Sequence, residues 1–202
     1  MISYLVFCAA GALLKLDSTY IAQFLISRPV FVGALLGMLF GDFCAGVQLG
    51  LFAEMLVLDH VPVGGHVPPA SIIWTVSALA MKIFMGVPVA WAFFGGFLLG
   101  ISFPRIEEKL RHVRSGWNER AEAEVMENPE GAVVKWMLLG PAMQAGAYFV
   151  FISLGAWLVG TGVLAAVKYS PVFVASGVTV AYWAVPWIGF SSLIGNLSPR
   201  RV

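Results

Sequence analysis

The chain has 202 residues, of which 59% are hydrophobic and only 11% are charged, against roughly 25% charged residues in a typical soluble domain. A soluble domain of this length cannot hide so much apolar surface in its core, so we expect an integral membrane protein whose first partner is the lipid bilayer. The net charge of +1 and the lack of a basic run give no sign of a nucleic-acid partner.

The first predicted element is a membrane helix over Met1 to Leu14. This segment is apolar and has no basic region at its start, which argues against a cleaved signal peptide. Cys8 and Cys44 lie in apolar segments without a C-x-x-C spacing, so we expect two small buried thiols rather than a disulfide or a metal site. A partly polar connection, residues 16–29, follows.

Two long apolar segments come next, Val30 to Leu58 and Ser71 to Phe103, and each exceeds the about 20 residues that one crossing needs. Gly41-Asp42 and Pro88 could split them into broken or re-entrant helices. Glycines at four-residue spacing let helix backbones approach closely in lipid. They are Gly33, Gly37 and Gly41 in the first segment, and Gly96 and Gly100 in the second.

Charge is concentrated between Pro104 and Gly131, which hold five of the twelve Lys and Arg and seven of the eleven Asp and Glu. Helix-forming residues and opposite charges four positions apart, such as Glu107 with Arg111, predict a solvated helical hairpin with a break near Ser115-Gly116. Because Lys and Arg favour the cytoplasmic side, we place this loop there, together with the Arg200-Arg201 tail.

The last part of the chain is expected to cross the membrane twice, with break points at Gly160-Thr161-Gly162 and Pro171, and a kink or break at Pro186. We therefore divide the chain into membrane segments 1–103, a charged cytoplasmic loop 104–131 and membrane segments 132–202. The predicted fold class is all-α: a polytopic membrane helical bundle with broken or re-entrant segments.

Three acids lie in or beside apolar segments: Asp42, Glu54 and Asp59. A carboxylate at bilayer depth costs at least about 2.5–3.5 kcal/mol, so it normally faces a cavity or a partner. Glu54 has apolar residues on all sides of a helix and must point towards protein or water. Asp42 could instead cap a helix end, and Lys82 is the candidate counter-charge.

After Leu58 the sequence changes to "DHVPVGGHVPPAS", in which prolines and the Gly64-Gly65 pair prevent a helix. Non-helical backbone between membrane segments offers free N–H and C=O groups that could bind a hydroxyl-rich ligand; a plain external loop is the other interpretation. The candidate substrate-binding residues are Glu54, Asp59, His60, Gly64, Gly65, His66 and Pro69.

Two other chemistries are open to these side chains. Asp59, His60 and His66 could bind a metal in a membrane-embedded metalloenzyme, although D-H-x5-H matches no standard metalloprotease spacing. Glu54, Asp59 and His60 could relay protons. The sequence contains no Ser-His-Asp arrangement or Gly-rich phosphate loop, so we expect no catalytic residue and no cofactor.

The stretch "LDSTYIAQFLISRPVFVGALLGMLFGDFCAGVQLGLFAEMLVL" resembles the IIC subunit of the mannose, fructose and sorbose family of the phosphoenolpyruvate-dependent sugar phosphotransferase system. The resemblance is clear over residues 10–80. Its matching elements are Asp17, the Arg28-Pro29 pair, Gly41-Asp42, the Gly50-x-x-x-Glu54 segment, and Gly64 and Pro69 in the following loop.

The resemblance implies a sugar-translocating permease in the bacterial inner membrane that moves a sugar inward for phosphorylation. It implies a IID membrane subunit and cytoplasmic IIA and IIB proteins as partners, and we also expect a homo-oligomer. The phosphorylated histidines belong to those cytoplasmic proteins, so the chain itself is expected not to be an enzyme.

Glu54 and Gly64 correspond to family site positions, and Arg28 and Asp42 are assigned structural or gating roles. Asp59 and His66 depart from the family pattern and bear on which sugar is accepted. A subunit that assembles but no longer transports is the other alternative.

Overall fold

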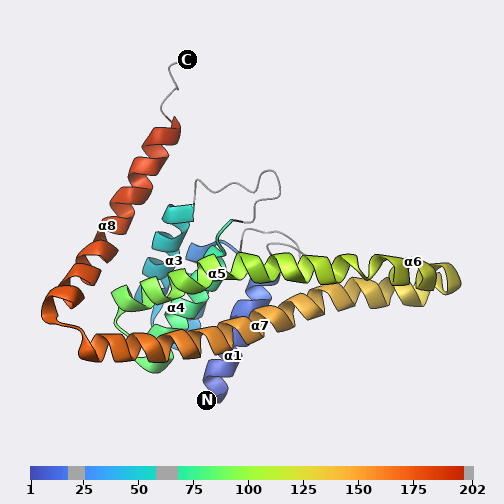
Figure 1. The fold of residues 1–202 in the computed structure, drawn as a ribbon, viewed down its shortest axis with the longest axis horizontal. Coiled ribbons are helices and arrows are strands. Elements are labelled where there is room, and N and C mark those ends of the chain that lie inside the picture. Colours follow the sequence, from blue (N-terminus) through green and yellow to red (C-terminus); the bar gives the residue numbers. More distant parts are fainter. Residues whose placement is uncertain (18–25, 58–67, 198–202) are drawn as a thin grey trace.

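The computed structural model describes residues 1–17, 26–57 and 68–197, and within them every regular element is a helix (Figure 1). The all-α prediction is therefore confirmed. The helices are α1 (Ile2–Leu16), α2 (Pro29–Phe40), α3 (Phe43–Val57), α4 (Ser71–Met85), α5 (Val89–Ser115), α6 (Asn118–Glu127), α7 (Pro129–Tyr169) and α8 (Val172–Leu197).

Helices α2 and α3 form a tight hairpin. Its turn needs a left-handed residue, which Gly41 supplies with a φ of 95° while its N–H binds the carbonyl of Gly37. Asp42 then begins α3, because its Oδ1 accepts a hydrogen bond from the amide of Ala45 at 3.1 Å. The expected split at Gly41-Asp42 and the expected cap are both confirmed.

The second long apolar segment is split in the same way, into α4 and α5. Gly86 ends α4 with a φ of 69°, and α5 begins at Val89, directly after Pro88. The two helices pack closely because Gly96 lies against the carbonyl of Trp74, whose indole Nε1 donates to the carbonyl of Phe93 at 2.7 Å. The expected split near Pro88 is confirmed.

The C-terminal part corrects the expected break at Gly160-Thr161-Gly162 and the break that was one alternative at Pro186. Helix α7 runs without interruption through Gly160-Thr161-Gly162 and has 41 residues, which is about 60 Å at 1.5 Å per residue. Helix α8 likewise continues through Pro186. The break at Pro171 is confirmed, since α7 ends at Tyr169 and α8 begins at Val172.

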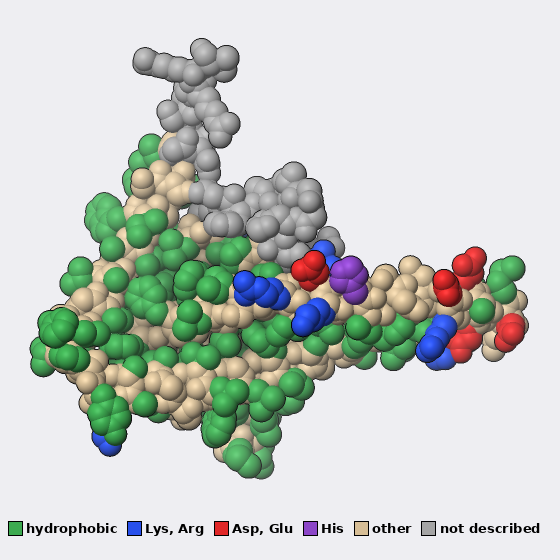
Figure 2. All heavy atoms as spheres, viewed as in Figure 1, with side chains coloured by type: hydrophobic (Ala, Val, Ile, Leu, Met, Phe, Trp, Pro, Cys, Tyr) green, Lys and Arg blue, Asp and Glu red, His purple; other side chains and the backbone are tan. Residues whose placement is uncertain are grey.

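A long arm extends away from the other helices (Figure 1). We define the arm as residues 104–140: the second half of α5, α6, and the start of α7. Charged side chains gather along it, whereas the rest of the surface in this view is largely hydrophobic (Figure 2). The two sides of the arm meet through the rings of Trp117, at the start of α6, and Trp136 on α7, whose centroids are 5.7 Å apart. The predicted helical hairpin, with its break after Ser115, is confirmed.

Polar side chains lie where the arm leaves the bundle. Glu107 is buried, and its Oε1 accepts from Arg111 at 3.0 Å, as the four-residue spacing predicts. From the end of α1, Lys15 places its Nζ 5.8 Å from the centroid of the Tyr148 ring on α7. The Lys15 contact thus joins α1 to α7, whereas the Glu107–Arg111 pair lies within α5.

Helix lengths and surface composition define the class of protein. Within the described ranges, three helical stretches are long and apolar enough to cross a bilayer: Val89–Glu127, Pro129–Tyr169 and Val172–Ile194. Helices α1 to α4 are apolar but have only 12 to 15 residues, short of the roughly 30 Å hydrocarbon core. Large apolar side chains such as Trp157, Trp183 and Trp187 point outward. This is the composition of a helical membrane bundle with short, paired segments.

Candidate functional site

The carboxylate of Glu54 is held by the start of the neighbouring helix. Glu54 lies in the last turn of α3, and its Oε1 is 3.1 Å from Nη1 of Arg28, the residue that precedes α2. Its Oε2 accepts a hydrogen bond from the amide of Val30 at 3.3 Å. The Glu54 side chain is 19% exposed and that of Arg28 is 48% exposed. The acid thus faces protein partners and keeps one edge open, as the sequence requires of a charge in an apolar helix.

Two small structural features bring Glu54 to this position. Pro29 is the first residue of α2 and has no N–H, so Val30 supplies the first amide that can bind a capping group. Gly50 lies against the carbonyl of Pro29 so closely that a Cβ would not fit. Because residues four apart share one helix face, Glu54 then lies one turn beyond this contact, within reach of Val30.

A second ion pair lies at the opposite end of the hairpin. Nζ of Lys82 on α4 is 3.8 Å from Oδ2 of Asp42, and both side chains are about one-third exposed. Lys82 is thus the counter-charge of Asp42 and not of Glu54. The sequence singled out both acids and both cations, but the pairing of Glu54 with Arg28 was missed. The signal for it was present: Arg-Pro at the start of one helix and Glu near the end of the next.

Of the remaining predicted site residues, the structure describes Pro69. Asp59, His60, Gly64, Gly65 and His66 lie outside the described residues. Pro69 is half-buried just before α4, where its carbonyl accepts from the amide of Ser71 at 2.9 Å. The structure therefore places Arg28, Asp42, Glu54 and Pro69 and brings together only Arg28 and Glu54. Three metal-ligating side chains do not converge anywhere in the described part of the chain.

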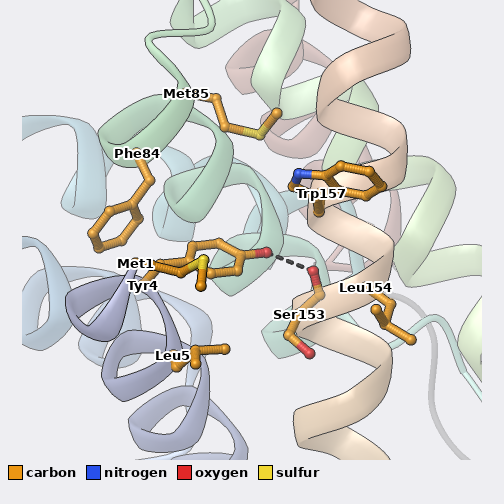
Figure 3. Close-up of a pocket in the computed structure, with 8 residues that line it drawn as sticks. All are labelled: Met1, Tyr4, Leu5, Phe84, Met85, Ser153, Leu154 and Trp157. Carbon is orange, nitrogen blue, oxygen red and sulfur yellow. Dashed lines mark hydrogen bonds between the residues drawn. The ribbon is translucent and has the colours of Figure 1, made fainter.

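A groove of about 520 Å³ lies between α1, α4 and α7 and has a different character (Figure 3). Its walls are mainly apolar, and Phe84 and Met85 place it at the end of α4 that also carries Lys82. The Tyr4 hydroxyl donates to the backbone carbonyl of Ser153, and the Ser153 hydroxyl donates to the carbonyl of Val150. With these polar atoms already bonded to protein, the groove offers a sugar little to bind.

Comparison with known proteins identifies the family. The profile described as "PTS system sorbose-specific iic component" matches residues 1–201. The chain therefore belongs to the sorbose-type IIC family of the sugar phosphotransferase system, as its resemblance to the mannose, fructose and sorbose family indicated.

Two further similarities were found, one to a curated relative and one to a solved structure. Over 82 residues the chain is 34% identical to the "Putative N-acetylgalactosamine permease IIC component 2" of Escherichia coli (strain K12). The matched region covers 38% of this chain and 62% of that relative. A solved chain described as "Structure of membrane protein" superposes with a TM-score of 0.77 at 16% identity, covering 99% of this chain and 81% of that one. The second likeness supports the fold.

Proposed function

We propose that this chain is the sugar-translocating IIC subunit of a phosphotransferase system and works in the bacterial inner membrane as a multi-pass protein. The observation that carries the proposal is the family match over residues 1–201. The apolar helical bundle, with a carboxylate held at the end of the α2–α3 hairpin, is the arrangement that such a task needs.

The proposed partners follow from the family. They are a IID membrane subunit and the cytoplasmic IIA and IIB proteins, which carry the phosphate. The chain itself has a transport role and no phosphorylated residue. His112 is exposed on the arm, and we do not assign it as a phosphorylation site. The arm, placed in the cytoplasm by its Lys and Arg content, lies on the side where IIB phosphorylates the sugar.

The proposed sugar site consists of Glu54 with the segment from Asp59 to Pro69. Sugars are recognised through their hydroxyl groups, and an ionised carboxylate forms stronger hydrogen bonds with them than a neutral acceptor does. Arg28 and the amide of Val30 use one direction on each oxygen of Glu54, which leaves other lone pairs for a ligand. Asp42, at the far end of the hairpin, has a structural or gating role.

The experiment is sugar uptake by a Glu54→Gln variant, expressed and reconstituted with its IID partner and supplied with IIA and IIB. The labelled probes are sorbose and N-acetylgalactosamine. Hydrogen bonds to charged groups are worth about 1.5–3 kcal/mol, so we expect the half-saturating sugar concentration to rise by about tenfold or more.

The control is Glu119→Gln, which removes the same charge from an exposed site on the arm. It should leave the half-saturating concentration unchanged. Unchanged uptake by Glu54→Gln would remove Glu54 from the site, and failure of the wild-type complex to take up either sugar would contradict the proposed function with these sugars.

A further inference from the structure

We propose that Arg28 is a positioning residue for the sugar site: it orients the Glu54 carboxylate and thereby sets the affinity for sugar. This inference rests on the proposed function, since it requires that Glu54 bind the sugar. It assigns a physical task to two short sequence elements, Arg28-Pro29 and Gly50-x-x-x-Glu54, which are 20 or more residues apart in the chain.

The geometry of the Glu54 carboxylate carries the inference. Arg28 binds Oε1 at 3.1 Å and the Val30 amide binds Oε2 at 3.3 Å, so both partners come from the start of α2. Two donors on two different oxygens fix the carboxylate plane, whereas one donor would leave it free to turn about the bond to its neighbouring carbon. A sugar that uses the remaining lone pairs therefore meets an acceptor with a fixed direction.

The two sequence elements meet where the start of α2 packs against the last turns of α3. Pro29 makes Val30 the first amide available to Glu54, and it places Arg28 immediately before the helix. On the other helix, Gly50 allows the close approach to Pro29 that brings Glu54 within reach. Arg28, Pro29, Gly50 and Glu54 thus act together, and the sugar contacts only the last of them.

Arg28 contributes a charge as well as a hydrogen bond. Its guanidinium lies 3.1 Å from Oε1 of a carboxylate that is only 19% exposed, so the two opposite charges attract each other. Without it, the amide of Val30 is the one hydrogen-bond donor to Glu54 that remains among the described residues. We therefore expect loss of Arg28 to weaken sugar binding without removing the binding group itself.

The test compares uptake kinetics of Arg28→Gln, Arg28→Lys and Lys82→Gln, each in the full complex with IID, IIA and IIB. The probe is sorbose or N-acetylgalactosamine, whichever the wild type takes up. A half-exposed ion pair is worth up to about 1 kcal/mol, so Arg28→Gln should raise the half-saturating concentration by up to about fivefold with little change in maximal rate. Arg28→Lys keeps the charge and should recover part of the affinity.

Lys82→Gln is the matched control, because it breaks the ion pair at the other end of the same hairpin. If ion pairs merely hold the hairpin together, Lys82→Gln and Arg28→Gln will reduce uptake in the same way. A change in half-saturating concentration for Arg28→Gln alone supports a positioning role, and equal changes for both would overturn it.

A double-variant cycle separates this inference from the proposed function. Arg28 acts through Glu54, so Arg28→Gln should have no further effect on half-saturation in a Glu54→Gln background. If Glu54→Gln raises half-saturation and Arg28→Gln does not, or if the two effects simply add, Arg28 is not a positioning residue while Glu54 remains in the site. If Glu54→Gln changes nothing, the proposed site itself is wrong.

Discussion

Gly33 and Gly46 determine how closely α2 and α3 approach each other. A Cβ at Gly33 would overlap the backbone carbonyl of Gly46, and the reverse also holds. Backbone atoms cannot move aside as a flexible side chain can, so the contact depends on the absence of both side chains. In lipid, where no hydrophobic effect drives helices together, such contacts supply the packing energy of a hairpin.

We therefore expect Gly33→Ala to destabilise the protein, by about 1–3 kcal/mol or more, although alanine is intrinsically better in a helix. Thermal unfolding in detergent would measure the change. Gly162→Ala is the control: Gly162 lies inside α7, about two turns before its end, with no neighbouring atom within 4 Å of the added Cβ, and the change should be neutral or stabilising by up to about 1 kcal/mol. Equal behaviour of the two variants would contradict this account of the hairpin.

At the residue scale the sequence predicted local relationships well. The cap by Asp42 and the pair of Glu107 with Arg111 depend on residues three or four positions apart, which any helix brings together. The pair of Arg28 with Glu54 joins residues 26 positions apart. It depends on where the α2–α3 turn falls and on how deeply Gly50 lets the helices approach, and periodicity reports neither quantity.

The arm shows an interaction between elements that the sequence did not indicate. Helix spacing alone would pair Glu124 with Arg120, four residues earlier. In the structure Glu124 reaches across to α7 and binds Lys135 through Oε1, while its Oε2 accepts from Nε1 of Trp136 at 2.7 Å. The charged side chains of the arm therefore join α6 to α7, in addition to making the surface of the arm polar.

This contact predicts a pH dependence. The hydrogen bond from Lys135, aided by Trp136, holds the pKa of Glu124 below its ordinary value of 4.5. A carboxyl group whose pKa is lower in the folded state stabilises that state above its unfolded pKa, and the contribution is lost as pH falls through the folded pKa. We therefore expect α6 to separate from α7 more often in acid, below about pH 4.5, than at neutral pH.

Hydrogen exchange of the α6 amides, corrected for the pH dependence of intrinsic exchange, would measure this opening. Glu124→Gln should show at pH 6 the reduced protection that the wild type shows only in acid, and its protection should change little with pH. Glu119→Gln, on the same helix, should behave as the wild type does. Protection in Glu124→Gln equal to that of the wild type at both pH values would show that Glu124 does not hold α6.

Breaks between elements were predictable where a glycine or proline has a backbone task to perform. Gly41 and Gly86 adopt positive φ, and Pro171 follows the end of α7. Gly160-Thr161-Gly162 was predicted as a break on composition alone, but α7 stays helical there. Gly160 instead lies against the side chains of Met81 and Met85 on α4. The same residue type can end a helix or permit close packing, and only the neighbouring helix decides between them.

For the whole molecule, composition predicted the class of protein, while the lengths of its helices required the structure. Among the first 85 residues, the described ranges 1–17, 26–57 and 68–85 form four apolar helices of 12 to 15 residues rather than full-length spans. The sequence indicated such short helices, because Gly41 and Pro88 divide its two long apolar segments. How these short helices pair is set by contacts between distant parts of the chain, such as Lys82 with Asp42.

The topology of the complete chain gives a final prediction. The arm carries much of the Lys and Arg content and should face the cytoplasm. Helix α7 is about 60 Å long in all, twice the roughly 30 Å of the hydrocarbon core, so it can cross the membrane and still contribute to the arm. The turn between α7 and α8 should then lie on the opposite side.

Cysteine variants test this arrangement in a Cys44→Ser background that keeps Cys8. Cys8 is buried as expected, whereas Cys44 is exposed, which corrects the prediction of a second buried thiol. Ser115→Cys reports on the end of α5 in the arm, and Val172→Cys, at the start of α8, reports on the far turn. A membrane-impermeant maleimide applied to spheroplasts should label Val172→Cys only, and the same reagent applied to inverted vesicles should label Ser115→Cys only. Reversed labelling would place the arm outside, and labelling of both sites from one side would mean that α7 does not cross the membrane.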